Sequence, residues 1–188
     1  MKLLQNEEHI IRAALDGDEG AFKELFLAYQ KPVYNFVYRM LGNVHDAADV
    51  TQEVFIKMYR HFSTLKKPAY FSTWLFSIAK NEAISALRRQ SKRQQQLDRS
   101  DIHQKADHVR APGDPDQQIL SSEFETLFQK ILSEIPEIYR VAFILGVLEE
   151  QPYEDVAKIL KCTVGNIKSR VFRARMMLCK KMKKLKVI

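Results

Sequence analysis

Apolar residues recur at steps of three and four along most of this chain, and this spacing constrains its fold more than any other feature. Near the N-terminus, Phe22, Leu25, Phe26 and Tyr29 form one such stripe. Only six glycines and six prolines interrupt the 188 residues, which argues against many short strands joined by turns. With 46% hydrophobic residues, the chain has enough apolar material for packed cores. The sequence therefore predicts an all-α protein.

The periodic segments predict a succession of helices. The expected helices span about residues 10–15, 18–29, 32–41, 44–62, 71–89, 119–135, 136–145, 153–161 and 164–185. Asp18 is placed to cap the second helix, and Pro32 suits the first turn of a third, so these two are expected as separate helices. Cys162 and Cys179 fall at positions that predict small buried apolar residues.

The central stretch breaks this pattern and predicts a linker. Residues 90–116 contain no aromatic residue, and their apolar residues are isolated among Gln, Asp, Arg and Ser. Such a segment buries too little apolar surface to offset the entropy lost on ordering. The sequence therefore predicts two small helical domains, residues 1–90 and 118–188, joined by a flexible linker over residues 91–117.

Charge is concentrated at the C-terminal end. The formal net charge is +7, and residues 118–188 contribute +5 of it, with 13 basic against 8 acidic residues. No acidic residue follows Asp155, whereas 11 basic residues lie between Lys158 and Lys186. This distribution favours a polyanionic partner for the C-terminal domain.

Residues 153–175 have the pattern of a helix-turn-helix. Ala157 supplies the small residue needed where two helices cross, and Thr163 can cap the second helix. The outward positions of that helix carry side chains suited to base edges and phosphates. They are Asn166, Lys168, Ser169, Arg170, Arg173 and Arg175. A helical hairpin with a merely solvated basic face is the alternative interpretation.

Two further blocks lie in the N-terminal half. Residues 46–57 predict a helix with an apolar stripe and an opposite face of carboxylates and amides, the pattern of an ordinary amphipathic helix. Residues 71–81 are followed by Arg88 and Arg89 and preceded by a loop with Lys66 and Lys67. Trp74 lies among apolar residues, which favours burial over base stacking.

With these blocks in this order, and with the pattern Gly-x-x-x-Ser-Arg-x-x-Arg-Ala-Arg at 165–175, the chain resembles the extracytoplasmic function (ECF) sigma factors of the sigma-70 family. The resemblance covers about residues 16–182. It implies a sigma region 2 domain at 1–90 and a region 4 helix-turn-helix domain at 118–188. It also implies a protein without catalytic activity, metal or cofactor that brings core RNA polymerase to promoters and promotes opening of the −10 element.

The resemblance also assigns the site residues. The −35 element falls to the outward residues of the recognition helix given above. The −10 element falls to Lys66, Lys67, Ser72, Thr73, Lys80, Asn81, Arg88 and Arg89. Docking on the clamp helices of the largest polymerase subunit falls to Asp46, Asp49, Gln52, Glu53 and Ile56. Asn166 and Thr163 differ from the residues usual in the family, so the −35 sequence preference stays open.

Further partners are implied by the resemblance alone. They are the flap region of the polymerase and an anti-sigma factor, often membrane-tethered, in a stress response. No apolar run approaches the length of a membrane span, so a cytoplasmic location is expected. In the family the linker enters the polymerase cleft; five aspartates between Asp98 and Asp116 suit a basic channel, and a passive tether fits equally well.

Other classes of function explain less of the chain. A free-standing helix-turn-helix regulator accounts for residues 136–185 but not for the two N-terminal blocks. An enzyme is disfavoured because no Ser/His/Asp set, phosphate-binding Gly loop or metal-ligand spacing is present. An adaptor that acts through protein contacts alone does not explain the basic charge of the C-terminal domain.

Overall fold

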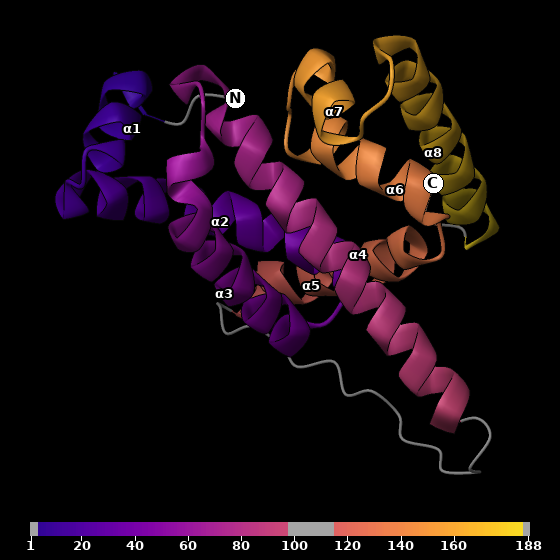
Figure 1. Ribbon diagram of the computed structural model, residues 1–188. Coiled ribbons are helices and arrows are strands. Elements are labelled where there is room, and N and C mark those ends of the chain that lie inside the picture. Colours follow the sequence, from indigo (N-terminus) through magenta and orange to yellow (C-terminus); the bar gives the residue numbers. More distant parts are fainter. Residues whose placement is uncertain (1–3, 98–114, 186–188) are drawn as a thin grey trace.

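The computed structural model describes residues 4–97 and 115–185, and the side chains of residues 4–95 and 123–185. Every regular element in these ranges is helical, as the sequence predicts (Figure 1). The long elements are α1 (Glu7–Leu15), α2 (Glu19–Leu41), α3 (Val44–His61), α4 (Phe71–Leu97), α5 (Pro115–Ser133), α6 (Glu137–Phe143), α7 (Tyr153–Ile159) and α8 (Val164–Lys184). Two 3₁₀ turns, η1 (Phe62–Thr64) and η2 (Pro68–Tyr70), join α3 to α4, and the π-helical segment η3 (Ile144–Leu148) extends α6.

Helix α2 is continuous, so the two separate helices expected on either side of Pro32 were a wrong prediction. Asp18 caps its start by accepting a hydrogen bond from the Ala21 N–H at 3.0 Å. An interior proline costs a helix about 3 kcal/mol or more. Here the apolar stripe runs through the proline without losing register. Its fully buried members are Leu25, Tyr29, Val33, Phe36, Val37 and Met40. Burying that stripe outweighs the cost of Pro32.

Helices α2, α3 and α4 pack on one another through an aromatic core, and α1 lies against α2. The Tyr29 ring meets Phe71 edge-on at 5.1 Å between centroids, which joins α2 to α4. The Tyr29 hydroxyl donates to the Glu7 carboxylate at 2.7 Å, which ties α1 to the bundle. Burial, and secondly the bond to Glu7, raise the pKa of Tyr29 far above its ordinary value. Tyr29 is thus a structural hydroxyl that stays protonated.

The C-terminal helices form the predicted helix-turn-helix. Lys161 takes a left-handed backbone conformation (φ 50°) in the turn between α7 and α8. The Thr163 hydroxyl accepts from the Asn166 N–H at 3.2 Å and so caps α8. Gly146 of η3 lets Tyr153 of α7 approach closely, because a Cβ there would lie 2.9 Å from the tyrosine ring.

The structure adds two facts about the predicted linker and cysteines. Helix α4 continues to Leu97 and α5 begins at Pro115, while residues 98–114, with most of the linker aspartates, lie outside the described residues. The division of the chain at residues 90 and 118 stays a prediction. Cys179 is exposed and Cys162 half-buried, so the expectation that both are buried was wrong. Cys179 follows the buried Leu178, and one step of about 100° turns it away from the core.

The two sets of helices are in contact in this structure. Helix α7 packs against α4, and α5 and η3 pack against α2 (Figure 1). Among the described helices, none is both long and apolar enough to cross a membrane.

Candidate DNA-binding and protein-binding surfaces

Helix α8 presents two flanks on either side of its buried face. That face consists of Ile167, Val171, Ala174 and Leu178. At about 100° per residue, four of the predicted DNA contacts fall on one flank of the helix. They are Asn166, Ser169, Arg170 and Arg173, all exposed except the half-buried Arg170.

The other two predicted contacts, Lys168 and Arg175, fall on the opposite flank. They flank Phe172, which is 64% exposed, and the exposed Met176 lies at the outer edge. The six residues that the sequence analysis grouped together therefore belong to two surfaces: one polar and basic, the other basic and apolar. The two flanks could have been predicted from the sequence, because the buried stripe determines the direction of every other side chain on the helix.

Arg173 is positioned by a neighbouring helix. Its guanidinium donates to the Tyr139 hydroxyl of α6 at 3.1 Å and lies 5.9 Å from the centre of that ring. This contact restricts the arginine while leaving donors free for a base or phosphate. Arginine pairs with guanine edges and asparagine with adenine, so this flank has the chemistry of major-groove reading.

The predicted −10 residues divide into exposed and engaged groups. Those with open surface are Lys66, Lys67, Asn81, Arg88 and Arg89. Ser72 is half-buried close to the Tyr29 hydroxyl, so its side chain faces the bundle rather than open surface. Thr73 and Lys80 are half-buried. Burial and the nearby Lys161 lower the pKa of Lys80, which places the turn before α8 close to α4.

Tyr70 is a candidate that the sequence analysis did not select. It is 46% exposed at the end of η2, with the Lys67 ammonium 6.0 Å and the Lys158 ammonium 5.0 Å from its ring centre. An exposed ring flanked by cations is a platform on which an unstacked base can lie. Tyr70 follows Lys66 and Lys67 closely in the sequence, and this position could have indicated a role in binding the −10 strand. Trp74, by contrast, packs against Phe62 and Phe71, as the sequence predicts.

Helix α3 carries the predicted polymerase face. Asp49, Gln52 and Glu53 are exposed, and Ile56 is half-buried beside them on the same side of the helix. Asp46 differs from the others, because its carboxylate accepts a hydrogen bond from the Gln90 side chain at 2.6 Å. Asp46 therefore fastens α3 to α4, and the remaining four residues form a continuous surface.

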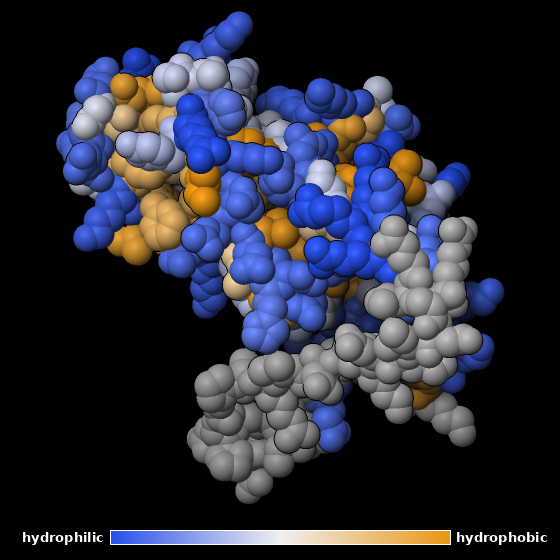
Figure 2. All heavy atoms as spheres, turned by 60° about the horizontal axis from the view of Figure 1, so that its bottom comes forward, coloured by the Kyte–Doolittle hydropathy of each residue, from blue (hydrophilic) through white to orange (hydrophobic). Residues whose placement is uncertain are grey.

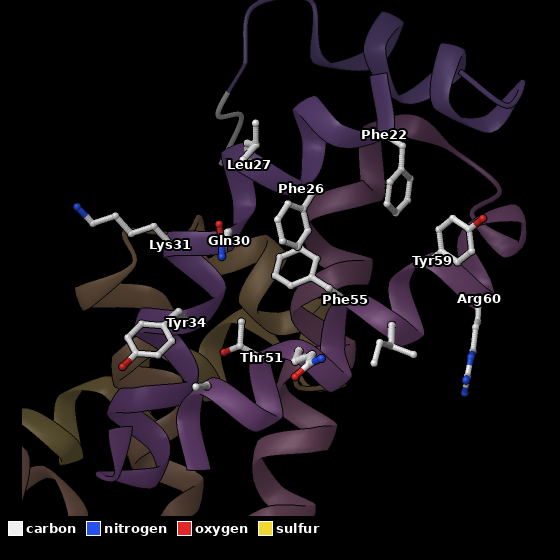
Figure 3. Close-up of a pocket in the computed structure, with 13 residues that line it drawn as sticks. Phe22, Phe26, Leu27, Gln30, Lys31, Tyr34, Thr51, Phe55, Tyr59 and Arg60 are labelled. Carbon is white, nitrogen blue, oxygen red and sulfur yellow. The ribbon is translucent and has the colours of Figure 1, made fainter. Parts of the chain in front are cut away.

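A groove between α2 and α3 adjoins this surface (Figure 3). It has a volume of about 1040 Å³, and Gln52 and Ile56 belong to its lining. The rings of Phe26 and Phe55 line it and meet edge to face with their centres 4.7 Å apart, and Tyr59 at its edge is 72% exposed. The spacing on α2 predicted Phe26 as a member of the core stripe and did not predict the groove. The apolar stripe on α2 is too wide for one buried face, and this width could have indicated a second apolar surface.

The groove also contains an unusual polar group. The Thr51 side chain lines it and is 7% exposed, and its hydroxyl has no hydrogen-bond partner in the described structure. Lys31 and Arg60 extend outward at opposite ends (Figure 3). A helix laid into this groove would find an apolar floor with basic groups at both ends.

Comparison with known proteins identifies the family. The sigma-70 region 2 family matches residues 25–93, and the sigma-70 region 4 family matches residues 125–178. An ECF RNA polymerase sigma-E factor of Haemophilus influenzae is 34% identical over 95% of this chain and 96% of its own length. The chain belongs to the ECF sigma factors. An ECF RNA polymerase sigma factor of Bacillus subtilis, SigW, is 32% identical over 93% of this chain and 96% of that protein.

A solved structure shares the fold of this sigma factor. The sigma factor RpoE of Bartonella quintana, in complex with the anti-sigma factor NepR, matches with a TM-score of 0.67 and 30% identity. The match covers 86% of this chain and 96% of the other. The chain is thus a promoter-directing sigma factor of RNA polymerase. Its region 2 match contains the α3 face and the loop before α4, and its region 4 match contains the helix-turn-helix.

Proposed function

We propose that this sigma factor divides promoter recognition among three surfaces. One flank of α8 binds the duplex −35 element, the end of η2 with α4 binds the melted −10 strand, and α3 with its groove binds core polymerase. One observation supports the proposal most strongly. The three surfaces lie on different helices of one chain, and each has the chemistry that its partner requires. The protein itself catalyses no reaction and acts in the cytoplasm.

The −35 surface consists of Asn166, Ser169, Arg170 and Arg173. These residues share a flank of a capped helix whose other side is anchored in the C-terminal core. Lys168 and Arg175 lie on the opposite flank, where they contact the DNA backbone or support the contact of Phe172 with the polymerase flap. The apolar character of Phe172 and Met176 suits a protein partner better than a base edge.

The −10 surface consists of Lys66, Lys67 and Asn81, to which we add Tyr70. Strand opening exposes bases that need an aromatic platform and a backbone that needs positive charge. Tyr70 with its neighbouring lysine supplies both. Arg88 and Arg89, exposed further along α4, extend the positive track.

The polymerase surface consists of Asp49, Gln52, Glu53 and Ile56 with the adjoining groove. Its partner is the pair of clamp helices of the largest polymerase subunit. Acidic side chains beside an apolar groove suit helices that present both basic and apolar residues. An anti-sigma factor that covers these surfaces is a further partner, which the complex of the Bartonella relative supports.

The test is transcription with purified core polymerase on a library of promoters randomised at both elements. The expected result is transcription that depends on this protein, with one preferred sequence near −35 and another near −10. A co-precipitation with core polymerase accompanies it. Tight binding of the isolated protein to duplex operators, without polymerase association, would overturn the proposal in favour of a free-standing regulator.

A further inference from the structure

Residues 65–71, which we call the −10 loop, carry most of the proposed −10 surface and are fixed at both ends by buried side chains. Leu65 is 7% exposed and Phe71 only 1%. Between them, the Tyr70 N–H donates to the Lys67 carbonyl at 3.0 Å and closes the turn η2. The exposed side chains of the loop therefore keep one geometry only while these two anchors stay in place.

The anchor at Phe71 rests on a buried tyrosine of α2. The rings of Tyr29 and Phe71 meet edge-on with their centres 5.1 Å apart, and Tyr29 is fully buried. Phe71 directly follows Tyr70 in the chain, so a shift of the Phe71 ring also displaces the exposed ring that we propose as the base platform.

Helix α1 holds that tyrosine through a glutamate. The Tyr29 hydroxyl donates to the Glu7 carboxylate at 2.7 Å, and Glu7 is 6% exposed, so the bond is shielded from water. Hydrogen bonds to a charged group are stronger than those between neutral groups. The Ser72 side chain lies close to the same hydroxyl. The hydroxyl is thus the point at which α1, α2 and the start of α4 meet.

Helix α1 also packs directly on the loop, because it contacts η2 as well as α2. Glu7, Ile11 and Ala14 are its buried residues, at the spacing of one helix face. The sigma-70 region 2 match begins at residue 25, after the end of α1. The loop is therefore braced by a helix that lies outside the matched region.

Stability alone does not account for a carboxylate at this place. Burying a carboxylate costs free energy, and an apolar residue of similar size would avoid that cost. An apolar residue would not, however, restrict the direction of the Tyr29 side chain as a hydrogen bond does. A carboxylate beside a loop that binds DNA would also repel phosphates if it were exposed, and here it is turned inward.

We infer that Glu7 and Tyr29 are positioning residues for recognition of the −10 strand. Acting through Phe71, they hold the ring of Tyr70 where an unstacked base meets it. Both are buried, so they act through the loop and do not touch DNA. This inference rests on the proposed −10 surface and adds α1 to the parts of the chain that determine promoter recognition.

The first test measures how the protein bound to core polymerase binds a single-stranded oligonucleotide with the −10 sequence selected from the promoter library. Glu7→Ala should weaken this binding by about threefold to tenfold, which is part of the effect of losing one stacked base. Electrostatics alone predicts the opposite sign, since the variant removes a negative charge near the DNA. Glu7→Gln removes the same charge but keeps an oxygen acceptor, so its affinity should stay within twofold of the original. Equal changes of affinity in the two variants would overturn the inference.

Matched variants separate the bond from other effects. Tyr29→Phe should reproduce the loss of Glu7→Ala, and the double variant should lose little more, because both substitutions remove one bond. Glu19→Ala, at the exposed first residue of α2, and Tyr38→Phe, which removes a half-buried hydroxyl on α2, should leave affinity unchanged. Additive losses in the double variant, or a loss in Tyr38→Phe equal to that in Tyr29→Phe, would contradict the inference.

Two further measurements distinguish positioning from a general loss of stability. Trp74 is the single tryptophan of the chain and packs against Phe71 with ring centres 6.1 Å apart, so its fluorescence in the free protein reports on the anchor. Acrylamide should quench it more in Glu7→Ala than in Glu7→Gln. On polymerase, Glu7→Ala should also lower the affinity ratio between the preferred −10 base and the other bases. An unchanged ratio would show that less protein is folded, and would overturn the inference.

The original protein keeps this test distinct from that of the proposed function. If it binds core polymerase but not the −10 oligonucleotide, the proposed −10 surface is wrong and the inference fails with it. If it binds the oligonucleotide, and Tyr70→Ala weakens that binding while Glu7→Ala and Tyr29→Phe do not, the −10 surface stands and only the positioning role is wrong.

Discussion

The N-terminal and C-terminal helices build their proposed DNA-binding surfaces in opposite ways. On α8, the reading flank belongs to a single helix, and its residues are held by their own helix and one neighbour, Tyr139. The −10 surface instead gathers a loop, the turn η2 and α4, and part of it lies under α7. The first surface exists wherever the helix forms, whereas the second depends on how the rest of the chain packs.

Charge differs between the two regions as well. Residues 118–188 carry +5, but residues 1–89 carry only +2, with 12 basic and 10 acidic residues. The N-terminal helices place acidic residues on α3 and basic ones around α4, so a small net charge conceals two surfaces of opposite sign. This contrast explains how one small bundle can bind both a protein and a nucleic acid.

The largest expected effect comes from reversing charge on the α3 face. Glu53→Lys should weaken association with core polymerase by roughly 2–5 kcal/mol, because it places a cation where the partner presents basic groups. Binding of the isolated protein to duplex −35 DNA should stay within twofold. Co-precipitation and fluorescence anisotropy measure the two quantities.

Glu24→Lys supplies the control for that variant, since Glu24 is exposed on α2 and lies outside the groove. Equal losses of polymerase binding in both variants would show that overall charge, rather than the α3 face, controls association.

The next largest effect distinguishes the two flanks of α8. Arg170→Ala or Arg173→Ala should each cost about 1–3 kcal/mol of −35 binding and relax the sequence preference at one position. Arg175→Ala, on the opposite flank, should weaken binding less and equally for all sequences. Core association should be unchanged in the first two. A larger sequence-specific loss from Arg175→Ala would show that the flanks are assigned the wrong way round.

A third prediction concerns the packing that orients α7. Gly146→Ala should lower the free energy of unfolding by about 1–3 kcal/mol, because its Cβ would lie 2.9 Å from the Tyr153 ring. Gly165→Ala is the matched control, since the nearest atom to its Cβ is 3.8 Å away, and it should raise stability slightly. Thermal unfolding measures both. Similar losses in the two variants would assign the effect to helix propensity rather than to close contact.

The sequence predicted the helices and the recognition helix because both depend on local spacing. The stripe on α8 and the cap at Thr163 are contained within a few turns of helix, and they were found correctly. Pro32 was misjudged because its local cost is outweighed by a stripe that extends over the whole of α2. The predicted helix boundary rested on Pro32 alone and not on the length of the apolar stripe around it.

The surfaces that depend on tertiary contacts could not be predicted from the sequence. Asp46 and Ser72 have the right chemistry for their predicted roles, yet Asp46 bonds to Gln90 and Ser72 lies against Tyr29, both far away in the chain. The groove beside α3 arises where Phe26 of α2 meets Phe55 of α3. Gln129 reaches the end of α2 across about ninety residues. No periodicity within one helix encodes such pairings.

The smallest expected effect is a pH dependence of the free energy of unfolding, through Glu149. Burial raises the pKa of this carboxyl to about 7, against an opposing effect of Arg39 on α2. A raised carboxyl pKa means that the folded form is favoured while Glu149 is protonated, and that this stabilisation is lost as the pH rises from about 4.5 through about 7. The free energy of unfolding, measured with urea, should therefore be higher at pH 5.5 than at pH 8, by up to about 1 kcal/mol because Glu149 is partly solvated. Glu149→Gln should remove this difference, whereas Glu150→Gln, at the exposed neighbouring residue, should keep it. A pH dependence that survives unchanged in Glu149→Gln would show that this carboxyl is not its cause.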